Sequence, residues 1–209
     1  VSNCAAYGLE FTANGSTGVL YMGGLVGENQ GAVSGSEAEC ALLEAKGTSF
    51  TEIYMGGLIG QNGSGGLISA SYAVGRLSGE TDKTSKASIC GLVGENQGTV
   101  SGCYSAMDLI ASGAYAQTYG LCPSDQGVDA SGYLGIGNFT YQEKSFNAAY
   151  SNEGVELLSH DELSDQDGAR FPRMGFQGNG YPYPTGVRNA NGEYVHYGEY
   201  PTPIDLGEM

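Results

Sequence analysis

The sequence predicts an all-β fold, a parallel β-solenoid of short strands closed by a C-terminal cap. Three observations support this prediction. A glycine-rich motif recurs at nearly constant spacing, an aligned strand pattern follows it, and glycine occurs 36 times in 209 residues. Abundant glycine suits many tight turns between short strands. Each copy of the motif is therefore expected to occupy one coil of the solenoid.

The motif is nearly identical in three copies and weaker in a fourth. It reads Gly-Leu-Val-Gly-Glu-Asn-Gln-Gly twice, Gly-Leu-Ile-Gly-Gln-Asn-Gly once, and Gly-Leu-Cys-Pro-Ser-Asp-Gln-Gly in the last copy. The copies start 33, 34 and 29 residues apart, at residues 24, 57, 91 and 120. A period of this length is typical of a solenoid coil.

A short strand pattern follows each of the first three motifs. Val-Ser-Gly-Ser at 33–36 aligns with Ile-Ser-Ala-Ser at 68–71 and with Val-Ser-Gly-Cys at 100–103. The first four residues, Val-Ser-Asn-Cys, match the same piece of an earlier copy. The sequence is therefore expected to begin partway round a coil of a longer protein.

Aligned residues of stacked coils should lie above one another, because neighbouring strands are about 4.8 Å apart. Two inward ladders are predicted, one of Leu25, Leu58, Leu92 and Leu121, and one of Met22, Met55 and Ile89. A polar ladder is predicted at the turn, formed by Asn29, Asn62, Asn96 and Asp125. Asparagine tolerates turn conformations, and its amide can hydrogen-bond the copies on either side, so this ladder is interpreted as structural rather than ligand-binding.

The period divides the chain into two parts, solenoid repeats over residues 1–135 and a capping segment over 136–209. The cap is expected to protect the unpaired strands at the end of the solenoid. A capping box predicts one short helix over 159–166, and an Asn-Gly turn predicts a hairpin over 189–198. Within the repeats, residues 44–51 and 79–87 are predicted to be projecting loops.

Composition excludes several classes of partner. The chain carries 23 acidic residues against 8 Lys and Arg, a net charge of −15, which disfavours nucleic acid and anionic membrane surfaces. No apolar run approaches the roughly 20 residues that span a bilayer, so no membrane insertion is predicted. The five cysteines lack metal-ligand spacing and are interpreted as small buried hydrophobes, although a disulfide across one coil stays open.

These residues resemble the GLUG motif, which occurs in arrays on large bacterial surface proteins, including adhesins and immunoglobulin-directed proteins of gut bacteria. The resemblance is strong over residues 1–135 and looser over 155–185, where a tryptophan usual in the family is missing and Phe171 and Phe176 are candidates to replace it. It implies a right-handed parallel β-helix, extracellular or cell-surface display, and binding to a host protein. The most specific candidate partner is the variable region of immunoglobulin, bound in the manner of a superantigen.

Tyrosines are the strongest candidates for protein contact, because they cover much area at little entropic cost. Tyr72, Tyr104 and Tyr133 form one aligned column, and Tyr21 and Tyr54 form another. Three basic residues lie in or beside the predicted 79–87 loop, and they complete the candidate patch: Arg76, Lys83 and Lys86. The favoured interpretation of both columns is that they are stacked aromatic ladders of the solenoid wall, and the contact patch is the alternative.

A catalytic site is the main rival on such a scaffold. Paired carboxylates about 5 to 9 Å apart support glycoside hydrolysis. Glu28 and Glu95 are aligned, but Gln61 lies between them, which places the carboxylates roughly 10 Å apart. No catalytic residue is therefore predicted. No cofactor or metal is predicted either, although calcium at Asp165-Gln166-Asp167-Gly168 stays open because this stretch faintly resembles a calcium loop. The isolated module is expected to be a monomer. A glycan-binding or glycan-cleaving module and a passive spacer stay open as alternatives.

Overall fold

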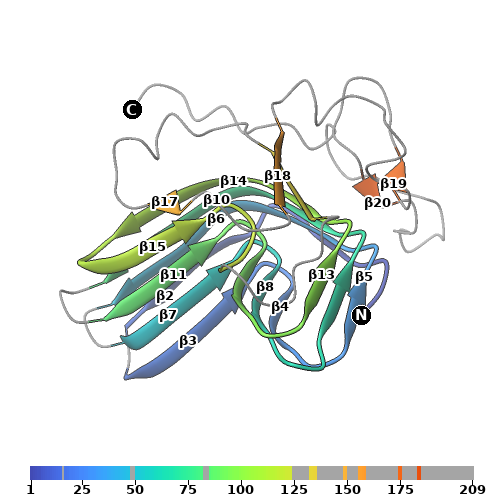
Figure 1. Cartoon of the computed structure of the whole chain (residues 1–209). Coiled ribbons are helices and arrows are strands. Elements are labelled where there is room, and N and C mark those ends of the chain that lie inside the picture. The colour runs from blue at the N-terminus through green and yellow to red at the C-terminus, as the bar shows by residue number, and fades with distance from the viewer. Residues whose placement is uncertain are drawn as a thin grey trace.

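The computed structural model describes residues 1–15, 17–47, 50–81 and 85–123, together with five short strands at later positions. All regular elements of these residues are β-strands. Four parallel sheets run along the stack of coils, and the strand sets β3–β6, β7–β10 and β11–β14 each add one strand to every sheet (Figure 1). This confirms the predicted parallel β-solenoid.

The two larger sheets form long walls. The seven-stranded sheet consists of β1 (Ala5–Ala6), β2 (Glu10–Asn14), β6 (Glu37–Gly47), β10 (Tyr72–Thr81), β14 (Tyr104–Ser112), β16 (Gly132–Gly135) and β18 (Val155–Leu158). The five-stranded sheet consists of β3 (Gly18–Gly23), β7 (Phe50–Gly56), β11 (Lys86–Cys90), β15 (Tyr115–Tyr119) and β17 (Ala148–Ala149).

Two three-stranded sheets follow the glycine motif round the coil. One consists of β4 (Val26–Asn29), β8 (Ile59–Asn62) and β12 (Val93–Asn96), and the other of β5 (Ala32–Ser34), β9 (Leu67–Ser69) and β13 (Thr99–Ser101). A separate antiparallel pair joins β19 (Met174–Gly175) to β20 (Tyr183–Pro184). No helix in the described part of the chain is long and apolar enough to cross a membrane.

The register between coils is the one that the repeat predicts. Met22 pairs with Met55, and Met55 pairs with Ile89. At the motif, the amide of Leu25 donates to the carbonyl of Leu58 at 2.9 Å, and the next two leucines continue the row. The side chains of Leu58, Leu92 and Leu121 are fully buried, as are those of Met55 and Ile89. Both predicted apolar ladders are thus confirmed in the core.

The asparagine ladder is also present. The Nδ2 of Asn29 donates to the Oδ1 of Asn62 at 2.7 Å, and the Nδ2 of Asn62 donates to the Oδ1 of Asn96 at 2.9 Å. All three side chains are buried. Each Nδ2 also reaches a backbone carbonyl of its own turn, those of Gly31, Gly66 and Gly98. The amides therefore join the turns of successive coils, while Asp125 lies outside the described residues.

The structure differs from the sequence-based expectations at the two predicted loops and at the start of the predicted cap. The predicted loops are largely strand, because β6 runs to residue 47, β7 begins at residue 50, β10 runs to residue 81 and β11 begins at residue 86. The described residues of these two segments lie mainly on strands, while residues 48, 49 and 82–84 lie outside the described part of the chain. In addition, β17 and β18 lie in the segment interpreted as a cap, yet they pair in parallel with β15 and β16. The predicted helix and hairpin lie outside the described residues.

The ladder generates a first prediction. Replacing Asn62 by alanine removes two buried side-chain hydrogen bonds between coils, and each such loss costs about 1–2 kcal/mol. Asn62→Ala should therefore lower the free energy of unfolding by about 2–3 kcal/mol, measured as a shift of the urea midpoint. Gln30→Ala, which changes an exposed amide in the equivalent turn of the preceding coil, is the control. Equal midpoints for the two variants would contradict a stabilising ladder.

Candidate binding face

The outer surface of the five-stranded sheet carries a set of exposed and half-buried side chains around one buried ring, that of Tyr54, which is 7% exposed. Side chains alternate along a strand, so Ile53 and Met55 enter the core while Glu52 and Tyr54 point outward. The pairing of the strands extends this outward set across the sheet. We define the tyrosine face as Val19, Tyr21, Glu52, Tyr54, Lys86, Tyr115, Gln117 and Tyr119.

Aromatic and basic groups stack along this face. The rings of Tyr21 and Tyr54 lie 5.4 Å apart at an interplanar angle of 15°. The Nζ of Lys86 lies 5.4 Å from the centre of the Tyr54 ring, within the range of a cation–π contact. Tyr115 pairs with Lys86 on the next strand and is 62% exposed. The face is therefore a rigid sheet surface with an open aromatic ring beside a cation.

Two tyrosine hydroxyls on this face are held by neighbours two residues away on the same strand. The hydroxyl of Tyr54 donates to the Oε2 of Glu52 at 3.1 Å, and that of Tyr119 donates to the Oε1 of Gln117 at 2.7 Å. Burial and the nearby Glu52 raise the pKa of Tyr54. Burial and Glu95 raise the pKa of Tyr21. Both phenols therefore stay protonated at neutral pH and can keep donating to carboxylates on or beside this face.

An acidic row borders the face. Glu28, Gln61 and Glu95 occupy equivalent positions on β4, β8 and β12. The Nε2 of Gln61 donates to the Oε2 of Glu95 at 2.7 Å, and the Nε2 of Gln30 donates to the Oε1 of Glu28 at 3.1 Å. The glutamine between the two carboxylates is present as expected, and amides hold both carboxylates.

Tyr72 and Tyr104, the first predicted contact residues, are aligned as expected but buried. Their rings stack at 4.9 Å with an interplanar angle of 6°, and their exposed fractions are 1% and 0%. The expectation of an exposed aromatic patch at these residues is therefore wrong. Val74 and Ala106, which follow these tyrosines on the same side of β10 and β14, are buried as well. The burial therefore extends over this part of the seven-stranded sheet. These two rings instead form a stacked ladder within the solenoid wall, which is the other interpretation of the tyrosine columns.

The other predicted contact residues are distributed differently. Tyr133 pairs with Tyr104 in register, which extends the column along the backbone. Arg76 is half-buried and lies opposite Asp108 in the register of β10 and β14, and Lys83 lies outside the described residues. Lys86 is exposed and belongs to the tyrosine face, so it alone of the six combines a described side chain with clear exposure.

Sequence reasoning missed Tyr115 and Tyr119. Both lie in Tyr-Ala-Gln-Thr-Tyr at 115–119, where polar and small residues alternate, the pattern of a half-buried strand. This stretch lacks the glycine motif and could not be aligned with the repeats by identity. Its pairing with β11 places both tyrosines on the same wall as Tyr54.

The cysteines do not form a site. All five are free thiols, and four of them are buried. Burial raises the pKa of the Cys40 thiol to about 12, so this thiol is unreactive at neutral pH. Among the residues that the structure describes, no group of three or more His, Cys, Asp and Glu could hold a metal ion.

Comparison of this chain with models of known protein families, with curated proteins and with solved structures identifies no match. The assignment of function therefore depends on the residues and geometry of the chain.

One buried carboxyl beside the tyrosine column is unusual. Glu37 pairs with Tyr72 and is 1% exposed. Burial raises its pKa from 4.5 to about 7; the Tyr72 hydroxyl opposes this rise and Glu39 adds to it. Between these two pH values the folded protein binds more protons at this residue than the unfolded chain does. Stability should therefore fall as pH rises through this window.

Glu37→Gln tests this dependence. The variant should match the parent protein near pH 4, where the carboxyl is protonated in both states. At pH 8 it should be more stable by up to about 3 kcal/mol, because it carries no buried charge. Urea midpoints at pH 4, 6 and 8 measure the difference, with the exposed-turn variant Glu28→Gln as control. A difference that does not change with pH would contradict the assignment.

Proposed function

We propose that this chain is a non-enzymatic binding module, displayed outside a bacterial cell, that binds a folded host protein through the tyrosine face. The observation that supports this most strongly is the exposed Tyr115 ring beside Lys86, on the same wall as the Tyr21–Tyr54 stack. Aromatic side chains of this kind contribute much of the binding free energy at protein interfaces.

The geometry suits a protein surface. The face is a β-sheet wall whose backbone is fixed by pairing on both sides at β7 and β11, so little ordering entropy is lost on binding. Hydroxyls at Tyr54 and Tyr119 are already oriented by Glu52 and Gln117. A partner can bury the exposed Tyr115 ring without rearranging the wall.

Charge narrows the class of partner. The face carries Glu52 and is bordered by Glu28 and Glu95, on a chain of net charge −15. A partner with basic residues round an apolar centre would be attracted to this surface and would associate faster at low salt. Lys86 provides one cation for an acidic or aromatic group at the centre.

The resemblance to the GLUG motif supports the more specific part of the proposal. It implies extracellular display and a host protein as partner, with the immunoglobulin variable region as the most specific candidate. The aligned carboxylates of Glu28 and Glu95 are separated by Gln61 and each accept from a glutamine amide instead of being paired as acid and base, which favours binding over catalysis.

Exposed side chains on the tyrosine face can be compared with an exposed side chain on another sheet. Tyr115→Ala and Lys86→Ala should each weaken binding to immunoglobulin Fab fragments by about tenfold or more, because each removes a central contact. Leu67→Ala is the control, since Leu67 is 54% exposed on β9, on another sheet. Surface plasmon resonance measures the affinities, with an immunoglobulin-depleted host secretion as a second analyte.

Three outcomes would contradict the proposal. Binding that survives Tyr115→Ala and Lys86→Ala but not Leu67→Ala would place the interface on another wall. Binding to a glycan array, with or without cleavage, would favour the glycan module. Absence of binding to every host protein and glycan tested would favour a passive spacer.

A further inference from the structure

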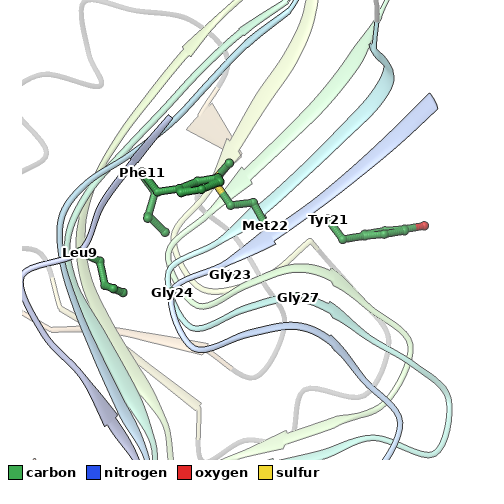
Figure 2. Close-up of a pocket in the computed structure, with 8 residues that line it drawn as sticks. Leu9, Phe11, Tyr21, Met22, Gly23, Gly24 and Gly27 are labelled. Carbon is green, nitrogen blue, oxygen red and sulfur yellow. The ribbon is translucent and has the colours of Figure 1, made fainter. Parts of the chain in front are cut away.

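One row of the tyrosine face carries charges of both signs beside an open ring. Successive residues of β3 point to opposite sides of the sheet, so that Met22 enters the core while Tyr21 points outward (Figure 2). On the outward side, Glu52, Lys86 and Tyr115 follow one another across β7, β11 and β15. An anion, a cation and an aromatic ring therefore lie on neighbouring strands, which are about 4.8 Å apart.

Lys86 does not form the ion pair that its register allows. It lies opposite Glu52, yet within the described part of the chain its ammonium takes part in no ion pair. Its Nζ lies over the Tyr54 ring instead, 5.4 Å from the centre. Contact with the face of a ring orients an ammonium without neutralising it. Lys86 therefore presents a full positive charge on the surface of a chain whose net charge is −15.

The nearest side-chain acceptors on either side of β11 already have donors. On β7, the Oε2 of Glu52 accepts from the Tyr54 hydroxyl at 3.1 Å. On β15, the Oε1 of Gln117 accepts from the Tyr119 hydroxyl at 2.7 Å. The two phenols therefore occupy these acceptors and leave the donors around them unused.

Three exposed donors remain without a hydrogen-bond or ion-pair partner among the residues that the structure describes. They are the Lys86 ammonium, the Tyr115 hydroxyl and the side-chain amide nitrogen of Gln117. Lys86 and Tyr115 are neighbours in register, and Gln117 lies two residues beyond Tyr115 on the same side of β15. We define these three residues as the donor cluster.

We propose that the donor cluster binds one carboxylate of the host protein, from an aspartate or glutamate side chain whose apolar neighbours pack on the Tyr115 ring. This inference rests on the proposed function, because it names the group that the tyrosine face recognises. A carboxylate accepts several hydrogen bonds and has no donor of its own. It therefore complements an ammonium, an amide and a hydroxyl whose own neighbouring acceptors are occupied.

Charge favours a carboxylate over a phosphate group. A phosphate monoester carries nearly two negative charges at neutral pH, and Glu52 lies beside Lys86 on a chain with 23 acidic residues. Repulsion from these carboxylates grows with the charge of the ligand. The single charge of a carboxylate is matched by that of Lys86.

The border of the face completes the description of the partner. Glu28 and Glu95 occupy equivalent positions on β4 and β12, where they attract basic residues of a partner. The expected surface on the host protein is therefore an acidic side chain with apolar atoms round it, set among basic residues.

Two peptides test the donor cluster on the full chain. Acetyl-Phe-Asp-Phe-amide carries one carboxylate between two rings, and acetyl-Phe-Asn-Phe-amide has the same shape without the charge. In NMR titrations the aspartate peptide should shift the backbone amide signals of Lys86 and Tyr115. It should bind about tenfold more tightly than the asparagine peptide, because a hydrogen bond to a charged group contributes about this much to binding.

Two lysine variants provide the matched comparison. Lys86→Gln should remove the preference for the aspartate peptide. Lys46→Gln makes the same change of charge and should keep the preference, because Lys46 lies on β6 and already pairs with Glu44 at 3.0 Å. In the Fab binding assay, Lys86→Gln should weaken binding about tenfold, and Lys46→Gln should leave it unchanged.

The outcomes separate this inference from the proposed function. Indistinguishable titrations of the two peptides, or an unchanged preference in Lys86→Gln, would overturn the inference even if Tyr115→Ala abolishes Fab binding. A preference that depends on Lys86, without binding to Fab or any other host protein, would support the carboxylate site and overturn the proposed function. Tighter binding of N-acetylneuraminic acid than of the aspartate peptide, lost in Lys86→Gln, would assign the site to an acidic glycan and overturn the inference.

Discussion

Parallel pairing of each coil with the next, in constant register, is the constraint on which the rest of the structure depends. It aligns equivalent residues, so that one position in the repeat becomes a column through the molecule. A column of leucines fills the core, and a column of asparagines joins the turns by side-chain hydrogen bonds. Because strands of neighbouring coils are about 4.8 Å apart, rings such as Tyr21 and Tyr54 can stack directly.

Register also explains why glycine dominates the motif. Where the chain turns from β7 into β8, the backbone of one coil approaches that of its neighbours too closely for a side chain at Gly56 or Gly60. Glycine is therefore a contact residue here, in the sense that it permits backbone packing.

The two long walls differ in what they leave for a partner. On the seven-stranded sheet the outward row that includes Glu37, Tyr72 and Tyr104 is buried, and the carboxyl in that row has a raised pKa. On the five-stranded sheet the outward row keeps Lys86 and Tyr115 exposed. The five-stranded sheet can therefore contact another molecule without any rearrangement of the solenoid.

The sequence by itself determined the period, the register and the inward ladders, because near-identical residues at nearly constant spacing align in only one register when the coils stack. It also identified Asn62 as a member of a turn ladder and Gln61 as the residue between two carboxylates. Only the tertiary structure decided that Tyr72 is buried and Tyr115 exposed. Alternation tells which side of a strand a side chain occupies, whereas its exposure depends on what packs over that side, and this is a property of the whole chain.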